Sequence, residues 1–402
     1  MPPVSRPQAL RLLLEAAAPL DAVFLAPAEA VGLAAAVDVA AGCDVPETAC
    51  SVRDGFALRS EDAAGTRSMR PARLAVRQCI RAESVAPAPV GRGEAARVLT
   101  GGTLPPGADC VLAEEDVEVR GEEILVSAPV RPGWFVRPVG GEIAAGTVVT
   151  PRGRIITPQA AAVMTRTRLS GVAVHPRPTA RVMALGSELA APGEASADRF
   201  PADNLVLAGG LLRQAGAVVS EASVLPDDKN RLVDILSRPD LPDLVITTGG
   251  TGNSERDFAR TGALAGGFEI LFDTVDMRPG RNLFAARRGA TLLFGLPGPP
   301  AAVFTCFHAL ILPAVRRLRG LPDPEGPITA RFTRGINARP GPEWLIQCEL
   351  SVNGSRITAL PLAGKEVPPM LGMGKALGLA VISGGATVMP GDEAEILTTL
   401  FE

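Results

Sequence analysis

The segment Leu244-Val245-Ile246-Thr247-Thr248-Gly249-Gly250-Thr251-Gly252 places five apolar or β-branched residues directly before a glycine-rich turn. A short apolar run bounded by glycine is typical of a buried strand. Glycines after such a strand let the backbone approach an anion closely, with free N–H groups at the start of the next helix. The segment therefore predicts a strand followed by a phosphate-binding turn; an ordinary loop is the alternative interpretation.

Outward from this segment, strands and helices alternate from residue 177 to residue 321. This alternation predicts a doubly wound parallel sheet, the central α/β domain of a multidomain chain. The expected strands are Ala180–Leu185, Val218–Val224, Leu244–Thr248, Ile270–Val275 and Thr291–Phe294, and the expected helices are Leu205–Ala215, Lys229–Ser237, Asp257–Leu264 and Ala301–Arg319.

The rest of the chain predicts flanking domains that are β-rich or helical. Residues 8–37 have helical spacing, and Thr157-Pro158 opens a further helix over Gln159–Thr165, so residues 1–44 and 140–176 are expected to form a linking domain. Residues 45–139 are expected to be a β-rich insert and residues 325–402 a C-terminal β-rich domain with a short helix near Met370–Leu377. The expected strands are Ala72–Val76, Arg97–Thr100, Cys110–Ala113, Glu123–Ser127, Ile328–Phe332, Leu345–Val352, Arg356–Leu360 and Glu393–Leu400.

The composition disfavours several classes of function. The formal net charge is −3, and 13 Phe, 2 Trp and no Tyr offer few stacking platforms, so we expect no nucleic-acid partner. No uninterrupted apolar run is long enough to predict a membrane span. The six cysteines form no C-x-x-C pair and there are two histidines, which disfavours a zinc site and suits a reducing cytoplasm.

Charged side chains follow the expected strands at their carboxyl ends. Glu188 follows the first strand, Asp227 the second, and Asp257 the glycine-rich turn, with Arg278 and Arg281 further along. Because ligands bind beyond the carboxyl ends of parallel strands, these groups are expected at one rim. Carboxylates beside a phosphate repel it unless a hard cation lies between them, which favours Mg²⁺. The plainer interpretations are a helix cap at Asp227-Asp228, a solvated arginine pair, and simple turns at Arg53-Asp54-Gly55 and Thr100-Gly101-Gly102.

Longer motifs make the sequence resemble a known family. Ser51–Ala57 resembles the family's S-x-M-D-G-Y-A, Leu99–Asp109 its T-G-A-x-x-P-x-G-A-D, and Gly140–Ile143 its G-E-D-I. Asp227-Asp228, the Gly249-Gly250 turn with Asp257, and Leu296–Pro300 follow in the family's order. On these motifs, residues 7–402 resemble the molybdopterin molybdenumtransferase (molybdenum insertase) family, which includes the C-terminal part of gephyrin, as a divergent member.

The resemblance implies an elongated homodimer with four domains per subunit. It implies that adenylated molybdopterin binds with Mg²⁺, that AMP is released, and that molybdate or tungstate enters molybdopterin. A molybdopterin-adenylylating protein and apo-molybdoenzymes are the implied partners. The implied catalytic residues are Asp54, Thr100, Glu142, Glu188, Asp227 and Asp257, with Asp227 and Asp257 as metal ligands and Asp54 and Thr100 reaching across the dimer interface. The implied cofactor-binding residues are Gly249, Gly250, Thr251, Gly252, Asn253, Ser254, Arg278, Arg281, Pro297, Gly298 and Pro300.

Several positions depart from the family pattern. Thr274 replaces a lysine, Arg278 and Arg281 replace two more, and Gly372 stands where the family has a serine-rich turn. The family's T-G-D-E-L is Leu185-Gly186-Ser187-Glu188-Leu189 here, and its S-G-G-V-S and P-G-N-P have become residues 248–252 and Pro297-Gly298-Pro299-Pro300. Lost donors predict that pterin binding is retained while molybdate affinity is low, or is shifted to another oxyanion or a partner-delivered metal. Two alternatives to insertion stay open: a non-catalytic molybdopterin-binding or carrier paralogue, and a pterin adenylyltransferase, whose T-T-G-G-T-G residues 247–252 resemble.

Overall fold

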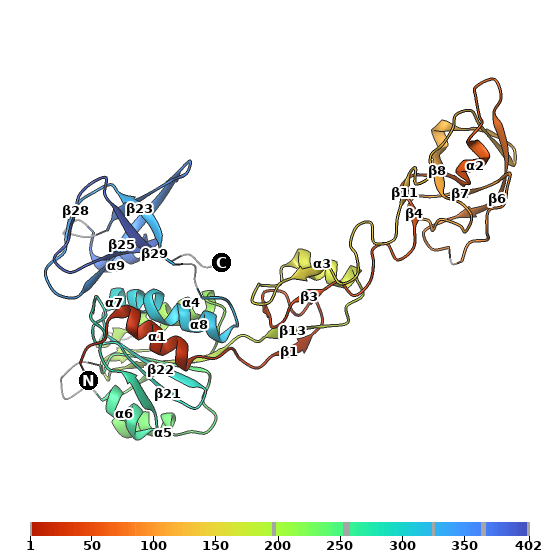
Figure 1. Cartoon of the computed structure of the whole chain (residues 1–402). Helices are drawn as coiled ribbons and strands as arrows, with labels where there is room; N and C mark the ends of the chain where they lie inside the picture. The colour runs from red at the N-terminus through yellow and green to blue at the C-terminus, as the bar shows by residue number, and fades with distance from the viewer. Residues whose placement is uncertain are drawn as a thin grey trace. The chain divides into compact units, whose positions relative to one another are not determined.

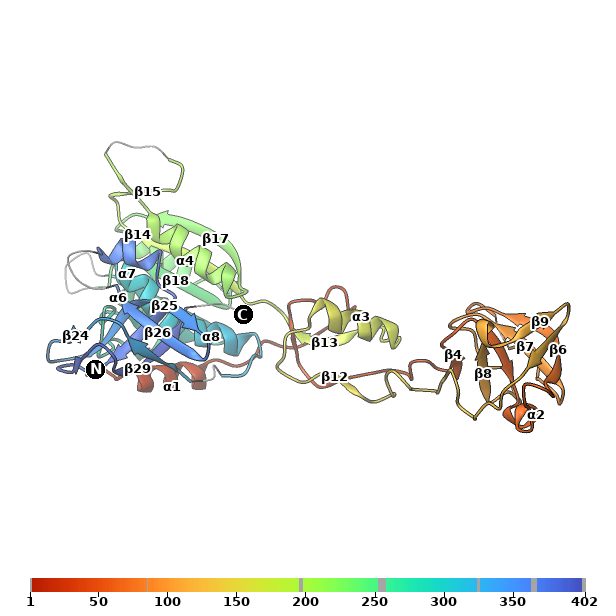
Figure 2. The ribbon, with the colours of Figure 1, turned by 90° about the horizontal axis from the view of Figure 1, so that it is seen from above.

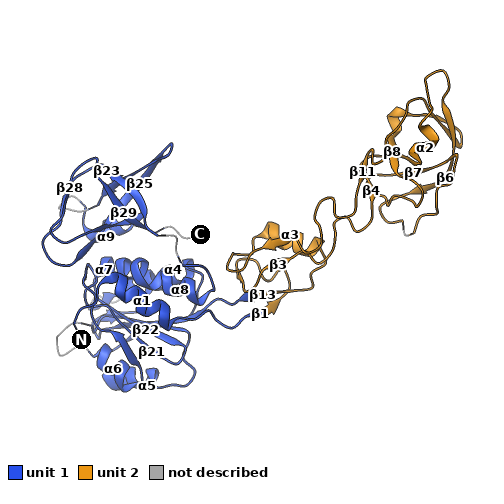
Figure 3. Cartoon of the chain, in the orientation of Figure 1, with its two compact units in different colours: residues 1–23, 174–402 blue, residues 24–173 orange. Residues whose placement is uncertain are grey.

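A computed structural model describes residues 2–84, 86–194, 198–251, 258–323, 326–362 and 367–399. The chain forms two compact units (Figure 3), with residues 1–23 and 174–402 in unit 1 and residues 24–173 in unit 2. Unit 2 is therefore an insertion, and the chain passes between the units twice. The finer division into four domains stays a prediction.

A six-stranded sheet forms the core of unit 1, with the order β17-β14-β18-β22-β21-β19. β17, β14, β18 and β22 are parallel neighbours, which confirms the predicted doubly wound sheet. β21 is not among the predicted strands. It runs antiparallel to β22 and is joined to it by a tight turn through Gly289, where φ is 59°. The strands are β14 (Thr179–Leu185), β17 (Val218–Leu225), β18 (Leu244–Thr248), β19 (Glu269–Phe272), β21 (Phe284–Arg288) and β22 (Thr291–Leu296).

Helices cover both faces of this sheet (Figures 1 and 2). Alternate residues of each strand point to opposite faces, so Val182 and Ile246 join one core cluster while Met183 and Val245 join the other. The first cluster also takes in α1 (Arg6–Ala16), α4 (Asp203–Gln214), α7 (Pro300–Cys306) and α8 (Leu312–Leu318), and the second takes in α5 (Lys229–Leu236) and α6 (Ala259–Ala265).

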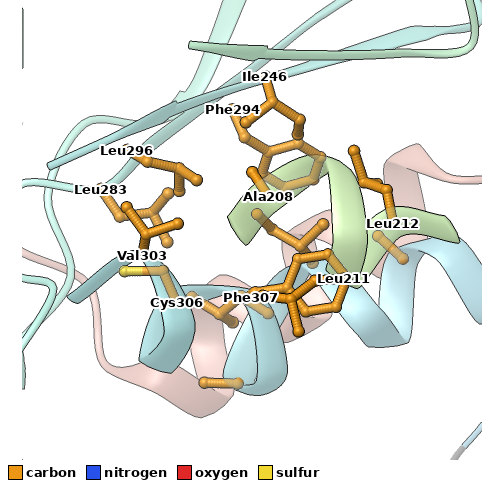
Figure 4. Close-up of a cluster of buried hydrophobic side chains, with 14 of the residues drawn as sticks. Ala208, Leu211, Leu212, Ile246, Leu283, Phe294, Leu296, Val303, Cys306 and Phe307 are labelled. Atoms are coloured by element: carbon orange, nitrogen blue, oxygen red, sulfur yellow. The ribbon is translucent and has the colours of Figure 1, made fainter. Parts of the chain in front are cut away.

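The helix predicted over Ala301–Arg319 is present, but a π-helical segment, η2 (Phe307–Ile311), separates α7 from α8. Phe307 packs with Leu211, Phe294 and other apolar side chains beneath the sheet (Figure 4). Pro300–Leu318 is long and apolar enough to span a membrane, yet 78% of its 18-residue window is buried inside the fold. It therefore has the surroundings of a core helix.

The C-terminal part of unit 1 is a closed five-stranded barrel. The ring closes because β25 pairs with both β26 and β27. β20 (Met277–Arg278) adds to β25 in parallel and ties the barrel to the loop after β19. The predicted strands and short helix of this region are confirmed as β23 (Ile328–Phe332), β25 (Glu343–Asn353), β26 (Arg356–Pro361), β29 (Glu393–Thr398) and α9 (Pro369–Met373), and β27 (Gly378–Ile382) is added to them.

Unit 2 contains a six-stranded sheet with the order β8-β5-β7-β6-β10-β9 and a smaller sheet, β1-β13-β2. Three predicted strands of the insert are confirmed as β6, β8 and β10, whereas the strand predicted over Arg97–Thr100 is β7, which begins at Glu94 and ends at Val98. Thr157 caps α3 (Pro158–Arg166) as expected. The helices predicted over residues 8–37 are wrong beyond Ala16, since Ala17 turns extended and β1 and β2 follow. The strands are β1 (Val23–Leu25), β2 (Ala34–Ala35), β5 (Gly55–Leu58), β6 (Ala72–Ile80), β7 (Glu94–Val98), β8 (Cys110–Ala113), β9 (Glu118–Arg120), β10 (Glu123–Val126) and β13 (Val172–His175).

Candidate functional site

The sheet order places a topological switch point between β14 and β18. The chain leaves β14 for its neighbour on one side, β17, and returns to β18 on the other side. Two connections that leave in opposite directions open a crevice at the carboxyl ends of the strands, where α/β sheets bind ligands. The residues that follow β14, β17 and β18 therefore form the candidate site.

The loops after β14 and β17 are locked together by two hydrogen bonds. The Ser187 hydroxyl accepts from the Asp227 backbone N–H at 3.0 Å, and the Ser187 N–H donates to Asp227 Oδ2 at 3.3 Å. Glu188 folds back over Gly186, because a Cβ on Gly186 would lie 2.8 Å from Glu188 Oε1. The structure thus brings the predicted Glu188 and Asp227 to the ends of adjacent strands.

The helix cap at this position is made by Asp228. Its Oδ1 accepts from the N–H groups of Asn230 at 2.9 Å and Arg231 at 3.2 Å, which are free at the start of α5. Asp227 makes neither bond. The cap interpretation is therefore correct for Asp228 and does not account for Asp227.

The turn after β18 approaches the loop after β22. Gly249 has a φ of 84°, donates to the Leu296 carbonyl at 3.0 Å, and a Cβ on it would lie 2.7 Å from the Leu185 carbonyl oxygen. Gly250 has a φ of 63°, and the buried Thr251 hydroxyl donates to the same Leu296 carbonyl at 3.4 Å. Only glycine adopts such backbone angles at low cost. The predicted Gly252, Asn253, Ser254 and Asp257 lie outside the described residues.

A cavity of about 750 Å³ opens between the loops of the sheet and the barrel of unit 1. Three of the predicted cofactor-binding residues line it, Arg278, Arg281 and Pro297, whereas Gly298 and Pro300 are not among its described lining residues. Arg278 lies over the ring of Trp344, with 5.6 Å from its guanidinium carbon to the ring centroid. Neither arginine has a salt-bridge partner among the described residues. Two unpaired guanidinium groups at one cavity favour an anionic ligand.

Asn204 is a buried polar residue that the sequence analysis misses. It lies in the first turn of α4, and its Nδ2 donates to the Gly298 carbonyl at 2.7 Å. Its Oδ1 is buried without a hydrogen-bond partner in the part of the chain that the structure describes. An amide directly before the expected helix Leu205–Ala215 was the available signal. This bond fixes the loop of Pro297, Gly298 and Pro300, the last of which begins α7.

The remaining predicted residues lie in unit 2. Thr100 donates to Asp54 Oδ1 from its hydroxyl at 2.7 Å and from its backbone N–H at 2.6 Å. These two hydrogen bonds hold the pKa of Asp54 below its usual value, so the carboxylate is ionised at neutral pH. Glu142 is ion-paired with Arg137. The structure thus unites Asp54 with Thr100 and gives Glu142 a cationic partner.

The carboxylates after β14 and β17 fit Mg²⁺ only as an ion that is shared with a phosphorylated ligand. Among the described residues, no group of three or more His, Cys, Asp or Glu side chains could hold a metal ion by itself. Mg²⁺ bound beside a phosphate takes one or two carboxylates and completes its octahedron with phosphate oxygens and water. Asp227 and Glu188 are carboxylates of that kind, so they fit a cation shared with a phosphorylated ligand.

Comparison with known proteins agrees with this geometry. Residues 4–167 match a family described as "MoeA N-terminal region (domain I and II)", and residues 181–317 match one described as "Probable molybdopterin binding domain". The second match covers the sheet, its switch point and its glycine turn. Fold and site therefore define a multidomain protein of molybdenum cofactor biosynthesis that carries a molybdopterin-binding domain.

The chain belongs to the molybdopterin molybdenumtransferase family of enzymes. It is 31% identical over 309 residues to molybdopterin molybdenumtransferase 2 of Mycobacterium tuberculosis strain H37Rv, covering 74% of this chain and 76% of that protein. It is 30% identical over 320 residues to the molybdopterin molybdenumtransferase of Staphylococcus aureus strain MRSA252, covering 79% and 76%.

Solved structures share the whole fold. A molybdopterin biosynthesis moeA protein from Pyrococcus horikoshii OT3 superposes with a TM-score of 0.76 at 26% identity, over 98% of this chain and all of that one. A second structure of a moeA protein from Pyrococcus horikosii gives a TM-score of 0.88 at 24% identity over both full chains. The MoeA-like multidomain fold expected from the motifs is confirmed.

Proposed function

We propose that this chain catalyses the Mg²⁺-dependent insertion of molybdate, or tungstate, into adenylated molybdopterin with release of AMP, in the cytoplasm. One observation supports this most directly: the Leu296–Pro300 loop connects two sites. Its Leu296 carbonyl holds the glycine turn at the switch point, and its Pro297 lines the cavity with the two unpaired arginines. A phosphate site and an oxyanion site that share one loop suit a reaction between a pterin nucleotide and molybdate.

Each part of the proposed site has a distinct role. Asp227, with Glu188 and Asp257, holds Mg²⁺, which when bound neutralises the phosphate charge and favours cleavage of the adenylate bond. Gly250 and Thr251, in the turn after β18, orient the phosphate through their backbone N–H groups, since the Gly249 N–H is bonded to the Leu296 carbonyl. Arg278 and Arg281 hold the oxyanion, and Pro297, Gly298 and Pro300 shape the wall between the two ligands.

The test is a single-turnover assay with adenylated molybdopterin, molybdate and Mg²⁺. AMP release that requires Mg²⁺, and activation of an apo-molybdoenzyme by the product, are the expected results. Tight pterin binding without AMP release would instead establish the non-catalytic carrier. Consumption of ATP with free molybdopterin would establish the adenylyltransferase, and would make a separate molybdopterin-adenylylating partner unnecessary.

We further propose that the chain acts as a homodimer whose sites combine unit 1 of one copy with unit 2 of the other. The observations behind this are the ionised Asp54 held by Thr100 and the paired Glu142, three predicted site residues that all belong to unit 2. Co-expression of Asp54→Ala with Asp227→Asn tests it. Mixed dimers would contain one intact site, so activity should return to about a quarter of the wild-type value. No recovery, with dimers present by sedimentation, would refute the composite site.

A further inference from the structure

Gln347 lies on the cavity wall, and its side-chain amide is not hydrogen-bonded to any described residue. It lies on β25 and lines the cavity, yet only 8% of its surface is exposed. Its backbone carbonyl accepts from Leu362 at 2.8 Å, whereas its side-chain amide makes no hydrogen bond to any described residue. An amide on a cavity wall that is not bonded to the protein keeps its hydrogen-bonding capacity for a ligand.

Gly372 on α9 provides the space that the amide occupies. A Cβ on Gly372 would lie 2.7 Å from Gln347 Oε1 and 3.5 Å from the Leu362 Cβ. Any side chain at position 372 would therefore push the amide aside. Because Oε1 is turned toward Gly372, Nε2 is the end of the amide that remains for a ligand.

The cavity offers hydrogen-bond donors and positive charge but no acid. Arg278 and Arg281 line it, and no carboxylate belongs to its described lining residues. A fully deprotonated tetrahedral oxyanion needs only donors, whereas hydrogen phosphate carries an O–H for which a carboxylate is the strongest acceptor. The side-chain acceptors that line this cavity are neutral, such as the amide oxygens of Asn282 and Asn337 and the Thr305 hydroxyl. Groups that reject a wrong ligand contribute to specificity as much as those that attract the right one.

We propose that Gln347 is the specificity-determining residue of the oxyanion site. Its Nε2 donates to the oxyanion that Arg278 and Arg281 hold, and Gly372 keeps the amide in that position. The cavity then selects fully deprotonated oxyanions such as molybdate, tungstate and sulfate, and rejects hydrogen phosphate. This inference rests on the oxyanion site of the proposed function, and it is an alternative to the low molybdate affinity that the lost donors predict.

Calorimetric titration of the full chain with molybdate, sulfate and phosphate tests the proposal, at about pH 6, where phosphate is mostly protonated, with and without adenylated molybdopterin. Wild-type protein should bind molybdate at least roughly tenfold more tightly than phosphate. Gln347→Leu should weaken molybdate and sulfate roughly tenfold or more, as the loss of a hydrogen bond to a charged group does. Gly372→Ala, which leaves the glutamine in place, should cause a similar loss. Gln347→Glu should weaken molybdate and raise the relative affinity for hydrogen phosphate.

The exposed Gln214→Leu on α4 is the matched control and should bind as wild type does. Thermal unfolding establishes that each variant is folded. Unchanged molybdate binding by both Gln347→Leu and Gly372→Ala, or equal wild-type affinity for phosphate and molybdate, would overturn the proposal while leaving the proposed function in place. Absence of any oxyanion binding by the wild-type protein would overturn the proposal together with the oxyanion site.

Discussion

Adjacent carboxylates in this protein have different roles. Asp228 accepts from two N–H groups of α5, while Asp227 accepts from the Ser187 N–H in the loop after β14. The difference follows from geometry, because only the N-cap residue can reach the N–H groups of the second and third helical positions. Two residues that look like one motif in the sequence thus make different contacts, and we propose a ligand-binding role for Asp227 alone.

Substitution of the two aspartates should separate these roles. Asp228→Ala should lower the free energy of unfolding by about 1 kcal/mol, the usual value of a cap, and leave Mg²⁺-dependent binding of adenylated molybdopterin intact. Asp227→Asn should leave the thermal midpoint nearly unchanged and weaken that binding. Urea unfolding and a Mg²⁺ titration of ligand binding measure both. Unaltered Mg²⁺ dependence in Asp227→Asn would remove Asp227 from the metal site.

An added methyl group should be tolerated very differently at Gly249 and at Gly298. Gly249→Ala should lower the free energy of unfolding by about 2 kcal/mol or more, because φ is 84° and the methyl would meet the Leu185 carbonyl. Gly298→Ala is the control: nothing lies within 4 Å of its Cβ position, so its effect should stay within about 0.5 kcal/mol. Equal midpoints in urea for the two variants would contradict this account.

The long apolar helix is the element on which the unit 1 core depends. Its π-helical segment η2 contains His308, which is 4% exposed and makes edge-on contacts with the rings of Phe304 and Phe307, with centroids 4.5 and 5.5 Å away. Desolvation lowers the pKa of His308 to about 4. The folded chain therefore keeps this imidazole neutral at a pH where the unfolded chain would protonate it.

The free energy of unfolding should depend on pH through the protonation of His308. Its contribution is fully present above the unfolded pKa of about 6.5 and is lost as pH falls toward 4, by up to about 3 kcal/mol, because the unfolded state binds the proton first. His308→Leu should flatten the slope of unfolding free energy between about pH 6.5 and 4.5. An identical slope in the variant and the wild-type protein would show that other groups cause the acid sensitivity.

At the scale of the whole molecule, unit 1 and the inserted unit 2 each have their own hydrophobic core clusters. Three described core clusters lie entirely in unit 1 and two entirely in unit 2. The two crossing points of the chain lie near each other, since β1 and β13 are paired neighbours in one sheet. Each unit should therefore fold without the other.

Removal of unit 2 tests this independence. A chain that joins residues 1–23 to residues 174–402 through a short Gly-Ser linker should unfold cooperatively and retain oxyanion binding. It should lose AMP release, because Asp54, Thr100 and Glu142 are removed with unit 2. Circular dichroism, calorimetry and the AMP assay measure the three properties. Full AMP release by the shortened chain would exclude the unit 2 residues from catalysis.

The sequence by itself determined the parts of this protein that depend on neighbours along the chain. The strands Leu244–Thr248 and Thr179–Leu185, the Thr157 cap and the residues at the strand ends follow from periodicity, turn chemistry and the parallel connection rule. The helices expected beyond Ala16 failed because apolar spacing alone did not detect the extended backbone of residue 17 and the strands after it.

Only the tertiary structure decided what long-range packing controls. The cavity joins a loop near residue 280 to a barrel strand near residue 347, and β25 brings Gln347 opposite Gly372 through strand and helix contacts that no local pattern encodes. Asn204 meets Gly298 for the same reason, since the two are 94 residues apart. Backbone conformation is largely set within a few residues, whereas the direction and partner of a buried polar side chain depend on which distant elements close around it.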